Sequence, residues 1–163
     1  MKKRIYSVIE VKNRELYARI LFSIKMAEAG YSIVLGKKSN LYKYANYFKK
    51  GLFVFKGMGP KNINIMKKLK FLGHKIVGYD EEGLVMNLVD EIPRRIKKEC
   101  LDFVEYYFTV GKKQKDNTVK IYPEFEKKII PVGNPRFDLL KKPINNIYSI
   151  EIEKIKKKYG KFI

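Results

Sequence analysis

The fold of this chain is decided by the apolar run Lys75-Ile76-Val77-Gly78-Tyr79, which leads directly into Asp80-Glu81-Glu82-Gly83. A short apolar run bounded by polar residues predicts a buried strand of a parallel sheet. In an open α/β sheet, ligands bind at the carboxyl ends of such strands. Three consecutive carboxylates are unusual in a chain whose formal net charge is +19. The stretch therefore predicts either a functional carboxylate cluster or an acidic turn that caps the next helix.

Strands and helices alternate along the residues that precede this stretch. Strands are expected at 4–11, 31–35, 52–55 and 75–79, and helices at 14–29, at 40–48 and from Pro60 onward. Each expected helix is followed by a glycine, which suits a helix end. Strands that alternate with helices imply right-handed crossovers between parallel neighbours. The expected fold class is therefore α/β, with a Rossmann-like parallel sheet and helices on both of its faces.

The second half of the chain continues this alternation less regularly. A helix broken near Pro93 is expected at 85–100, strands at 103–110 and 128–132, a polar helix or loop at 111–119, and a helix at 149–159 that Ser149 caps and Gly160 ends. The final residues, 161–163, resemble the first residues of another strand. We expect one domain over 1–142, then a linker, a helix and the truncated start of a second domain over 143–163. The natural protein is accordingly expected to continue.

Composition narrows the class of protein. A chain of 163 residues with 45% hydrophobic residues is long enough to bury the core of one domain. No apolar stretch approaches the roughly 20 residues that a membrane span requires. Cys100 and His74 are the only residues of their kinds, so they supply neither an internal disulfide nor a zinc site. These features favour a cytoplasmic protein, and His74 is expected to be structural.

The basic excess favours anionic partners without identifying one. Lysine and arginine number 36 against 17 acidic residues, but only six of the basic residues are arginine, and they are spread along the whole chain. Arginine is the preferred residue for base-edge and bidentate phosphate contacts. Nucleotides, acidic glycans and the head groups of an anionic membrane are therefore compatible partners, the last as a peripheral contact at the inner membrane face. Binding to nucleic acid is not favoured.

Two loops at expected strand ends carry polar or permissive residues. Glu10 interrupts an apolar run at the end of the first strand, so it is expected to be paired or functional. Lys12, Asn13 and Arg14 follow it, and Asn13 could simply cap the first helix. Gly57 and Gly59 precede Pro60 and form a weak candidate for a phosphate-binding loop. The plainer interpretation of these two glycines is a βα loop that needs permissive backbone.

Two further segments follow later strands. Lys112 lies in a cationic segment after the strand at 103–110, and it could pair with the carboxylates of 80–82 or line the same cleft. The segment Gly133-Asn134-Pro135-Arg136-Phe137-Asp138 follows the last strand. Asn134 and Pro135 suit the first two positions of a helix, and Arg136 could clamp an anion. The alternative is a well-capped helix with a surface pair between Arg136 and Asp138.

Four segments together resemble bacterial surface carbohydrate biosynthesis proteins, which are GT-B glycosyltransferases of capsule and lipopolysaccharide synthesis. They are Val8–Glu15, Gly30–Gly36, Gly73–Gly83 and Gly133–Asp138. The last is also similar to a motif of CDP-glycerol glycerophosphotransferases. Asp80-Glu81-Glu82-Gly83 is similar to a Glu-Asp-Gly element of capsule Kdo transferases, and the different order leaves open whether Glu81 or Glu82 takes the key position.

The resemblance implies a two-domain enzyme with a cleft between Rossmann-like halves. This chain matches the acceptor-side amino-terminal half, whereas the donor-binding half is not in it. A nucleotide-sugar is then the donor substrate of the full-length protein, a glycan or lipid-linked molecule is the acceptor, and this half binds no cofactor and demands no metal. Glu82 is the first choice for the catalytic carboxylate, Glu81 the second, with Asp80 beside them and Glu10 as a cleft-facing partner.

Two other functions remain open from the sequence. A basic α/β domain that binds nucleic acid would use the net charge of +19, but it would leave the acidic strand end unexplained. An enzyme similar to nucleotide-sugar epimerases would share the two-domain build. Glycosyltransferases and epimerases differ in chemistry, because glycosyl transfer needs an acceptor and epimerisation does not.

Overall fold

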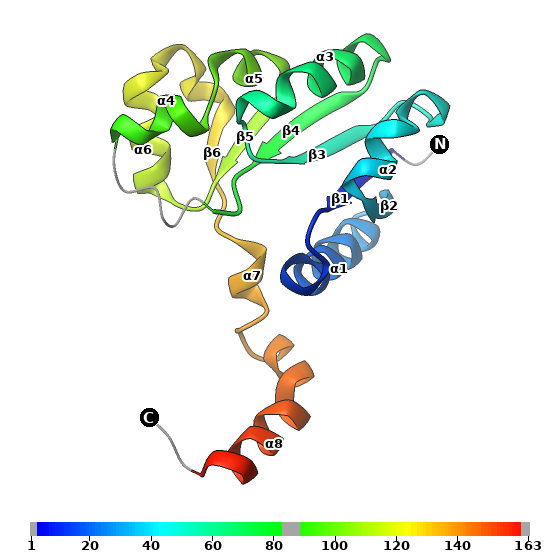
Figure 1. Cartoon of the computed structure of the whole chain (residues 1–163), viewed down its shortest axis with the longest axis vertical. Coiled ribbons are helices and arrows are strands. Elements are labelled where there is room, and N and C mark those ends of the chain that lie inside the picture. Colours follow the sequence, from blue (N-terminus) through cyan, green and yellow to red (C-terminus); the bar gives the residue numbers. More distant parts are fainter. Residues whose placement is uncertain (1–2, 83–88, 161–163) are drawn as a thin grey trace.

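The computed structural model describes residues 3–82 and 89–160 (Figure 1). Its strands are β1 (Arg4–Ile9), β2 (Ser32–Lys37), β3 (Leu52–Lys56), β4 (Lys75–Tyr79), β5 (Tyr106–Thr109) and β6 (Ile129–Pro131). Its α-helices are α1 (Lys12–Glu28), α2 (Lys38–Lys43), α3 (Ile63–Phe71), α4 (Ile92–Arg95), α5 (Lys98–Phe103), α6 (Lys112–Ile121), α7 (Pro135–Asp138) and α8 (Ser149–Tyr159). Short 3₁₀ turns include η1 (Ala45–Tyr47), η2 (Pro60–Asn62) and η6 (Ile144–Tyr148).

The six strands form one parallel sheet in the order β2-β1-β3-β4-β5-β6. The expected α/β fold with a Rossmann-like sheet is therefore confirmed, and β4 occupies the predicted residues. All strand pairs are parallel because a helix or turn segment carries the chain back across the sheet between them.

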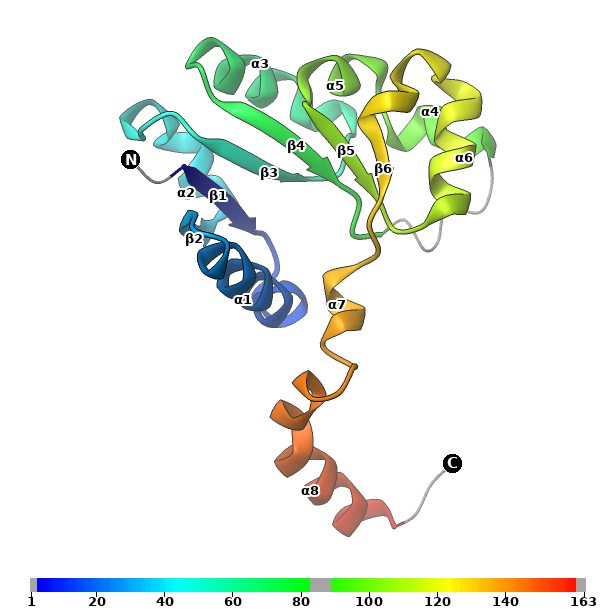
Figure 2. The same ribbon diagram turned by 180° about the vertical axis from the view of Figure 1, so that it is seen from behind.

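The main core lies on one face of the sheet, under α2, α3, α5 and α6 (Figures 1 and 2). Alternate strand residues point into this core, among them Tyr6, Phe53, Ile76 and Tyr107, each 1% exposed or less. His74 packs beside Tyr6 and Phe53. Its Nδ1 accepts from the Gly51 N–H at 3.3 Å, and its Nε2 lies 3.2 Å from the Ala45 carbonyl oxygen, so it serves the core.

The opposite face carries the intervening strand residues and is covered by α1. Ile5, Val54 and Val77 are buried there against Phe22 and Met26 of α1. Beyond α1 this face is hollowed into an apolar groove of about 450 Å³. It runs from α1 across β4 and β5 to the segment that precedes α7.

The strand order creates a switch point between β1 and β3. The helix that follows β1 covers one face, whereas the helix that follows β3 covers the other (Figure 1). The two connections therefore diverge at the carboxyl ends of these adjacent strands. In doubly wound sheets such a divergence opens the crevice in which ligands bind.

Several predicted element boundaries were wrong. The helix expected at 40–48 is the short α2 followed by η1, and the strand expected at 103–110 spans only Tyr106–Thr109. Helix α1 begins at Lys12 with Val11 in the cap position, so Asn13 lies inside the helix and does not cap it. Ser149 is the first residue of α8, not its cap, although Gly160 ends that helix with φ 72° as expected.

Helix α8 lies away from the sheet, beyond α7 (Figures 1 and 2). The linker expected at 143–147 is largely the turn η6, and the ring of Tyr148 meets that of Tyr17 on α1 edge-on. The strand start expected at 161–163 lies outside the described residues. Within the described ranges, no helix is both long and apolar enough to cross a bilayer.

Candidate functional site

The acidic residues that follow β4 take three different environments. Asp80 is 7% exposed and is held by neutral donors and one cation. Gln114 Nε2 donates to its Oδ2 at 2.9 Å, and the Glu82 backbone N–H donates to its Oδ1 at 2.9 Å. Arg95 lies 3.7 Å away. Asp80 therefore organises the turn after β4 and ties it to α6.

Glu81 is buried between two arginines. Its Oε1 lies 2.6 Å from Arg19 Nη2 of α1, and its Oε2 accepts from Arg136 Nη2 of α7 at 2.6 Å. The carboxylate is only 6% exposed. The side-chain amide of Asn134 also donates to the Glu81 carbonyl oxygen at 3.3 Å. Both carboxylate oxygens are thus engaged in joining α1, β4 and α7.

Glu82 points toward solvent, with 49% of its side chain exposed. One oxygen lies 3.5 Å from Arg14 Nη1 and the other 3.4 Å from Arg95 Nη2. These exposed contacts are long and weak compared with those of Glu81. Glu82 is therefore the acidic residue of this turn that a ligand can reach. Gly83, which the sequence also placed at the site, lies outside the described residues.

Glu10 meets this cluster from the end of β1. Its two oxygens accept from Lys38 Nζ at 3.1 Å and from Lys56 Nζ at 3.2 Å. Partial burial raises the pKa of Glu10, but the two lysines outweigh it and lower the pKa below its ordinary value. With 44% of its side chain exposed, Glu10 is paired, as expected, and still accessible.

Glu15 on α1 binds residues at the carboxyl ends of β1 and β3. Its Oε2 accepts from the Glu10 backbone N–H at 2.8 Å, and its Oε1 accepts from Lys56 Nζ at 2.7 Å. Burial raises the pKa of Glu15, but these donors outweigh it and lower the pKa to about 2. The ends of β1, β3 and α1 are therefore joined through Lys56.

The segment after β6 has a structural role at this edge. Asn134 caps α7 as predicted, with its side-chain oxygen accepting from the Arg136 N–H at 3.0 Å. Arg136, expected either to clamp an anion or to form a surface pair with Asp138, binds the Glu81 carboxylate, so the surface pair is wrong. Asp138 pairs with Lys141 instead.

Three predicted cleft residues, Lys112, Lys12 and Asn13, lie outside the two cavities of this site. Lys112 is 83% exposed and pairs with Asp116 on its own helix, so it neither pairs with the carboxylates of 80–82 nor lines the two cavities. The neutral Gln114 contacts Asp80 instead. Lys12 and Asn13 are exposed at the start of α1, and Arg14 alone of this group contacts an acidic residue of the turn after β4.

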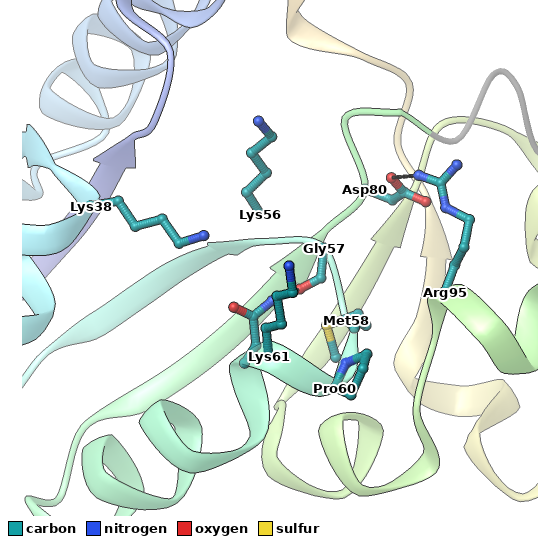
Figure 3. A pocket seen from close by; sticks show the side chains of 10 residues that line it. Lys38, Lys56, Gly57, Met58, Pro60, Lys61, Asp80 and Arg95 are labelled. Atoms are coloured by element: carbon teal, nitrogen blue, oxygen red, sulfur yellow. Dashed lines mark hydrogen bonds and ion pairs between the residues drawn. The ribbon is translucent and has the colours of Figure 1, made fainter.

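Two adjoining cavities open at this edge of the sheet. One, of about 360 Å³, is lined by Glu10, Arg14, Lys56, Gly57, Asp80, Glu81, Glu82 and Arg95. The other, of about 300 Å³, lies over the loop 57–59, and Figure 3 shows its lining. Lys56, Gly57, Asp80 and Arg95 line both. The site therefore lies at the switch point between β1 and β3 and extends to the end of β4.

Six residues that contact the predicted site residues were missed from the sequence: Glu15, Arg19, Lys38, Lys56, Arg95 and Gln114. One signal was present, because Glu15 and Arg19 are four residues apart and so share a face of α1. Lys56 directly follows an apolar strand, as Glu10 does. The contacts themselves depend on the strand order, which the sequence pattern does not fix.

No protein-family model matches this sequence, and no curated protein matches it either. Among solved structures, the chain is similar to a protein from Listeria monocytogenes named as a candidate UDP-N-acetylglucosamine 2-epimerase. The TM-score is 0.54 and the sequence identity 10%, over 79% of this chain and 44% of that protein. At this identity the likeness shows the fold alone, a Rossmann-like domain of a GT-B-like structure. This chain spans less than half of that protein's length.

Proposed function

We propose that this chain is the acceptor-side half of an enzyme that acts on nucleotide-sugars, and that its reaction is glycosyl transfer in the synthesis of bacterial surface polysaccharide. The observation that carries the proposal is the position of Glu82. This carboxylate is half exposed on a cavity of about 360 Å³ at the carboxyl edge of a parallel sheet, and Glu10 lines the same cavity. Such an edge is where α/β enzymes place their chemistry.

The proposed reaction uses Glu82 as a general base. Its carboxylate accepts the proton of the acceptor hydroxyl as that oxygen attacks the anomeric carbon of the donor. The bond from the sugar to the nucleotide diphosphate breaks, and positive charge develops on the sugar as in glycoside hydrolysis. Glu10, accessible on the same cavity, is placed to hold another acceptor hydroxyl or to stabilise that charge.

The cations around the site have a separate role. Arg14 and Arg95 contact Glu82 only through long, exposed ion pairs, so a substrate can displace them. They are then available to bind anionic groups of the substrate. Asp80, which accepts from Gln114, and Glu81, which pairs with Arg19 and Arg136, position this edge and take no proton in the proposed reaction.

A second candidate function is epimerisation of a nucleotide-sugar. The structural likeness to the candidate UDP-N-acetylglucosamine 2-epimerase supports it. The same cavity would then serve a carboxylate that removes a proton from the sugar carbon. The acceptor distinguishes this reaction from transfer, because epimerisation consumes none.

The test is a mass-spectrometric assay of the natural polypeptide that contains this chain. It is incubated with a panel of nucleotide-sugars, with and without a mixture of glycan and lipid-linked acceptors from a bacterial envelope. Transfer predicts a glycosylated acceptor and free nucleoside diphosphate only when acceptor is present. An isomeric nucleotide-sugar that forms without acceptor would establish the epimerase instead. Consumption of no nucleotide-sugar would contradict both.

A further inference from the structure

The loop 57–59, between β3 and η2, is held by both backbone and side-chain contacts. Met58 is 1% exposed, and its thioether lies against Gly78 of β4, where any Cβ would collide with the sulfur. The Gly57 N–H donates to the Tyr79 carbonyl oxygen at 2.9 Å, and the Gly57 φ of 77° lies in the left-handed region that favours glycine. The loop is thus fixed at both its backbone and its central side chain.

The carbonyl oxygens of this loop are all taken by protein donors. Asn62 Nδ2 donates to the Gly57 oxygen at 3.1 Å, and the Lys97 N–H donates to the Met58 oxygen at 2.9 Å. The Gly59 oxygen accepts from the Asn62 N–H at 3.0 Å. Because these lone pairs are used, the loop does not present bare carbonyl oxygens to an anion. Among the described residues, no acceptor meets the N–H groups of Met58 and Gly59.

Four cationic side chains surround the cavity over this loop. Its lining includes Lys38, Lys56, Lys61 and Arg95 against one carboxylate, Asp80. In Figure 3 the ammonium groups of Lys38 and Lys61 point into the space beside Gly57, and Arg95 lies across it next to Asp80. Asp80 is already held by Gln114 and Arg95, so its charge is compensated.

Lys61 differs from the other three cations. Lys38 and Lys56 bind Glu10, and Arg95 binds Asp80 and Glu82. Within the described part of the chain, no carboxylate pairs with Lys61. It is therefore the cation of this cavity that an incoming anion can bind without displacing an acidic partner.

We propose that this cavity is a phosphate-binding subsite, which takes a phosphate monoester or diphosphate group through Lys61, Lys38, Arg95 and the loop 57–59. Ammonium and guanidinium groups form strong charge-assisted bonds with phosphate oxygens. At about 300 Å³, the cavity lies at the lower limit of pockets that hold a whole ligand, so it suits a phosphate group and not an entire nucleotide. The remainder of the ligand would extend into the adjoining cavity at Glu82 and Glu10.

This inference deepens the proposed function, on which it rests for the identity of the larger substrate. The phosphate group has two sources, since a nucleoside diphosphate and a lipid-linked acceptor both carry diphosphate. The binding chemistry is the same for both. Probes that share the diphosphate and differ in what it carries will distinguish them.

The experiment measures binding of inorganic pyrophosphate to the 163-residue chain by ¹H–¹⁵N NMR and calorimetry at 150 mM salt, where non-specific attraction to the basic surface is screened. Amide signals of Gly57, Met58, Gly59 and Lys61 are expected to move on titration. Lys61→Ala is expected to weaken binding at least about fivefold. The matched control is Lys67→Ala, an exposed lysine of α3 outside the cavity, which is expected to change binding less than about twofold.

The outcomes are distinct from those of the enzyme assay. Equal weakening by Lys61→Ala and Lys67→Ala, or movement of signals elsewhere with none at 57–61, would overturn the subsite. Pyrophosphate bound at the loop by a protein that converts no nucleotide-sugar would leave the subsite standing and remove the proposed function. Uridine diphosphate and geranyl diphosphate are then compared, and the tighter ligand identifies the source of the phosphate group.

Discussion

The guanidinium of Arg19 and the carboxylate of Glu81 lie 2.6 Å apart, and their side chains are only 5% and 6% exposed. The other carboxylate oxygen binds Arg136, also at 2.6 Å. The first helix, the end of the fourth strand and the segment after the last strand therefore meet at one acidic residue. A buried charge without a partner costs free energy of folding, so Arg19 and Glu81 each stabilise the fold only while the other is present.

Glu81→Gln is expected to destabilise the protein by about 3 kcal/mol, because it leaves the buried Arg19 and the partly buried Arg136 without their acidic partner. The measurement is urea unfolding followed by circular dichroism. Glu105→Gln is the matched control, since Glu105 pairs with Lys70 at the surface, and a loss of at most about 0.5 kcal/mol is expected there. Equal stabilities for the two variants would contradict the role assigned to Glu81.

Glu82→Gln is expected to lower turnover strongly and to leave stability nearly unchanged. The side chain is half exposed and makes only long ion pairs, so the free energy of unfolding should change by less than about 0.5 kcal/mol. Turnover of the natural polypeptide should fall at least about 100-fold, the lower end for loss of a general base. Turnover like that of the unaltered protein would remove Glu82 from the proposed mechanism.

The pH dependence of stability should include a contribution from Glu15. Its pKa is lowered from 4.5 to about 2 in the folded protein, so the folded state favours the charged form. The stabilisation is fully present above about pH 4.5 and is lost as the pH falls toward 2. Glu15→Gln should cost about 2 kcal/mol at pH 7 and almost nothing near pH 2.

Urea unfolding at pH 7, 4, 3 and 2 measures this difference. Glu28→Gln is the control, because Glu28 forms only an exposed pair with Lys25. The unfolding free energy of Glu28→Gln should follow that of the unaltered protein at all four pH values. A constant offset between Glu15→Gln and the unaltered protein across this range would show that the ion pairs of Glu15 do not carry the effect.

Gly78→Ala should destabilise the protein by about 1–3 kcal/mol through overpacking against Met58 and Tyr107. The added methyl group would also push Met58, and with it the loop 57–59. In the background of Met58→Ala, which removes the colliding sulfur, the same substitution should cost about 1 kcal/mol less. A double-mutant cycle of unfolding free energies measures this coupling, and additive losses would contradict the contact.

The sheet and β4 could be predicted from the sequence because buried parallel strands carry short apolar runs separated by glycine-ended helices. The order of the strands could not be predicted from the sequence, and this order determines which side chains meet at the site. It places β3 between β1 and β4, so that Lys56 reaches Glu10 and Glu15 from the adjacent strand end. The separate roles of Asp80, Glu81 and Glu82 could not be predicted from the sequence either. They depend on which side chains of other elements contact each carboxylate, and those contacts follow from the fold.

Glu81 also bears on the order in which the protein assembles. Its partners lie 62 residues earlier, at Arg19, and 55 residues later, at Arg136. These contacts can form only when almost the whole sheet is in place, so we expect them to be absent from the folding transition state. Their loss should then accelerate unfolding while leaving the folding rate nearly unchanged. By this reasoning, Glu81 contributes to the lifetime of the native state more than to the speed with which it is reached.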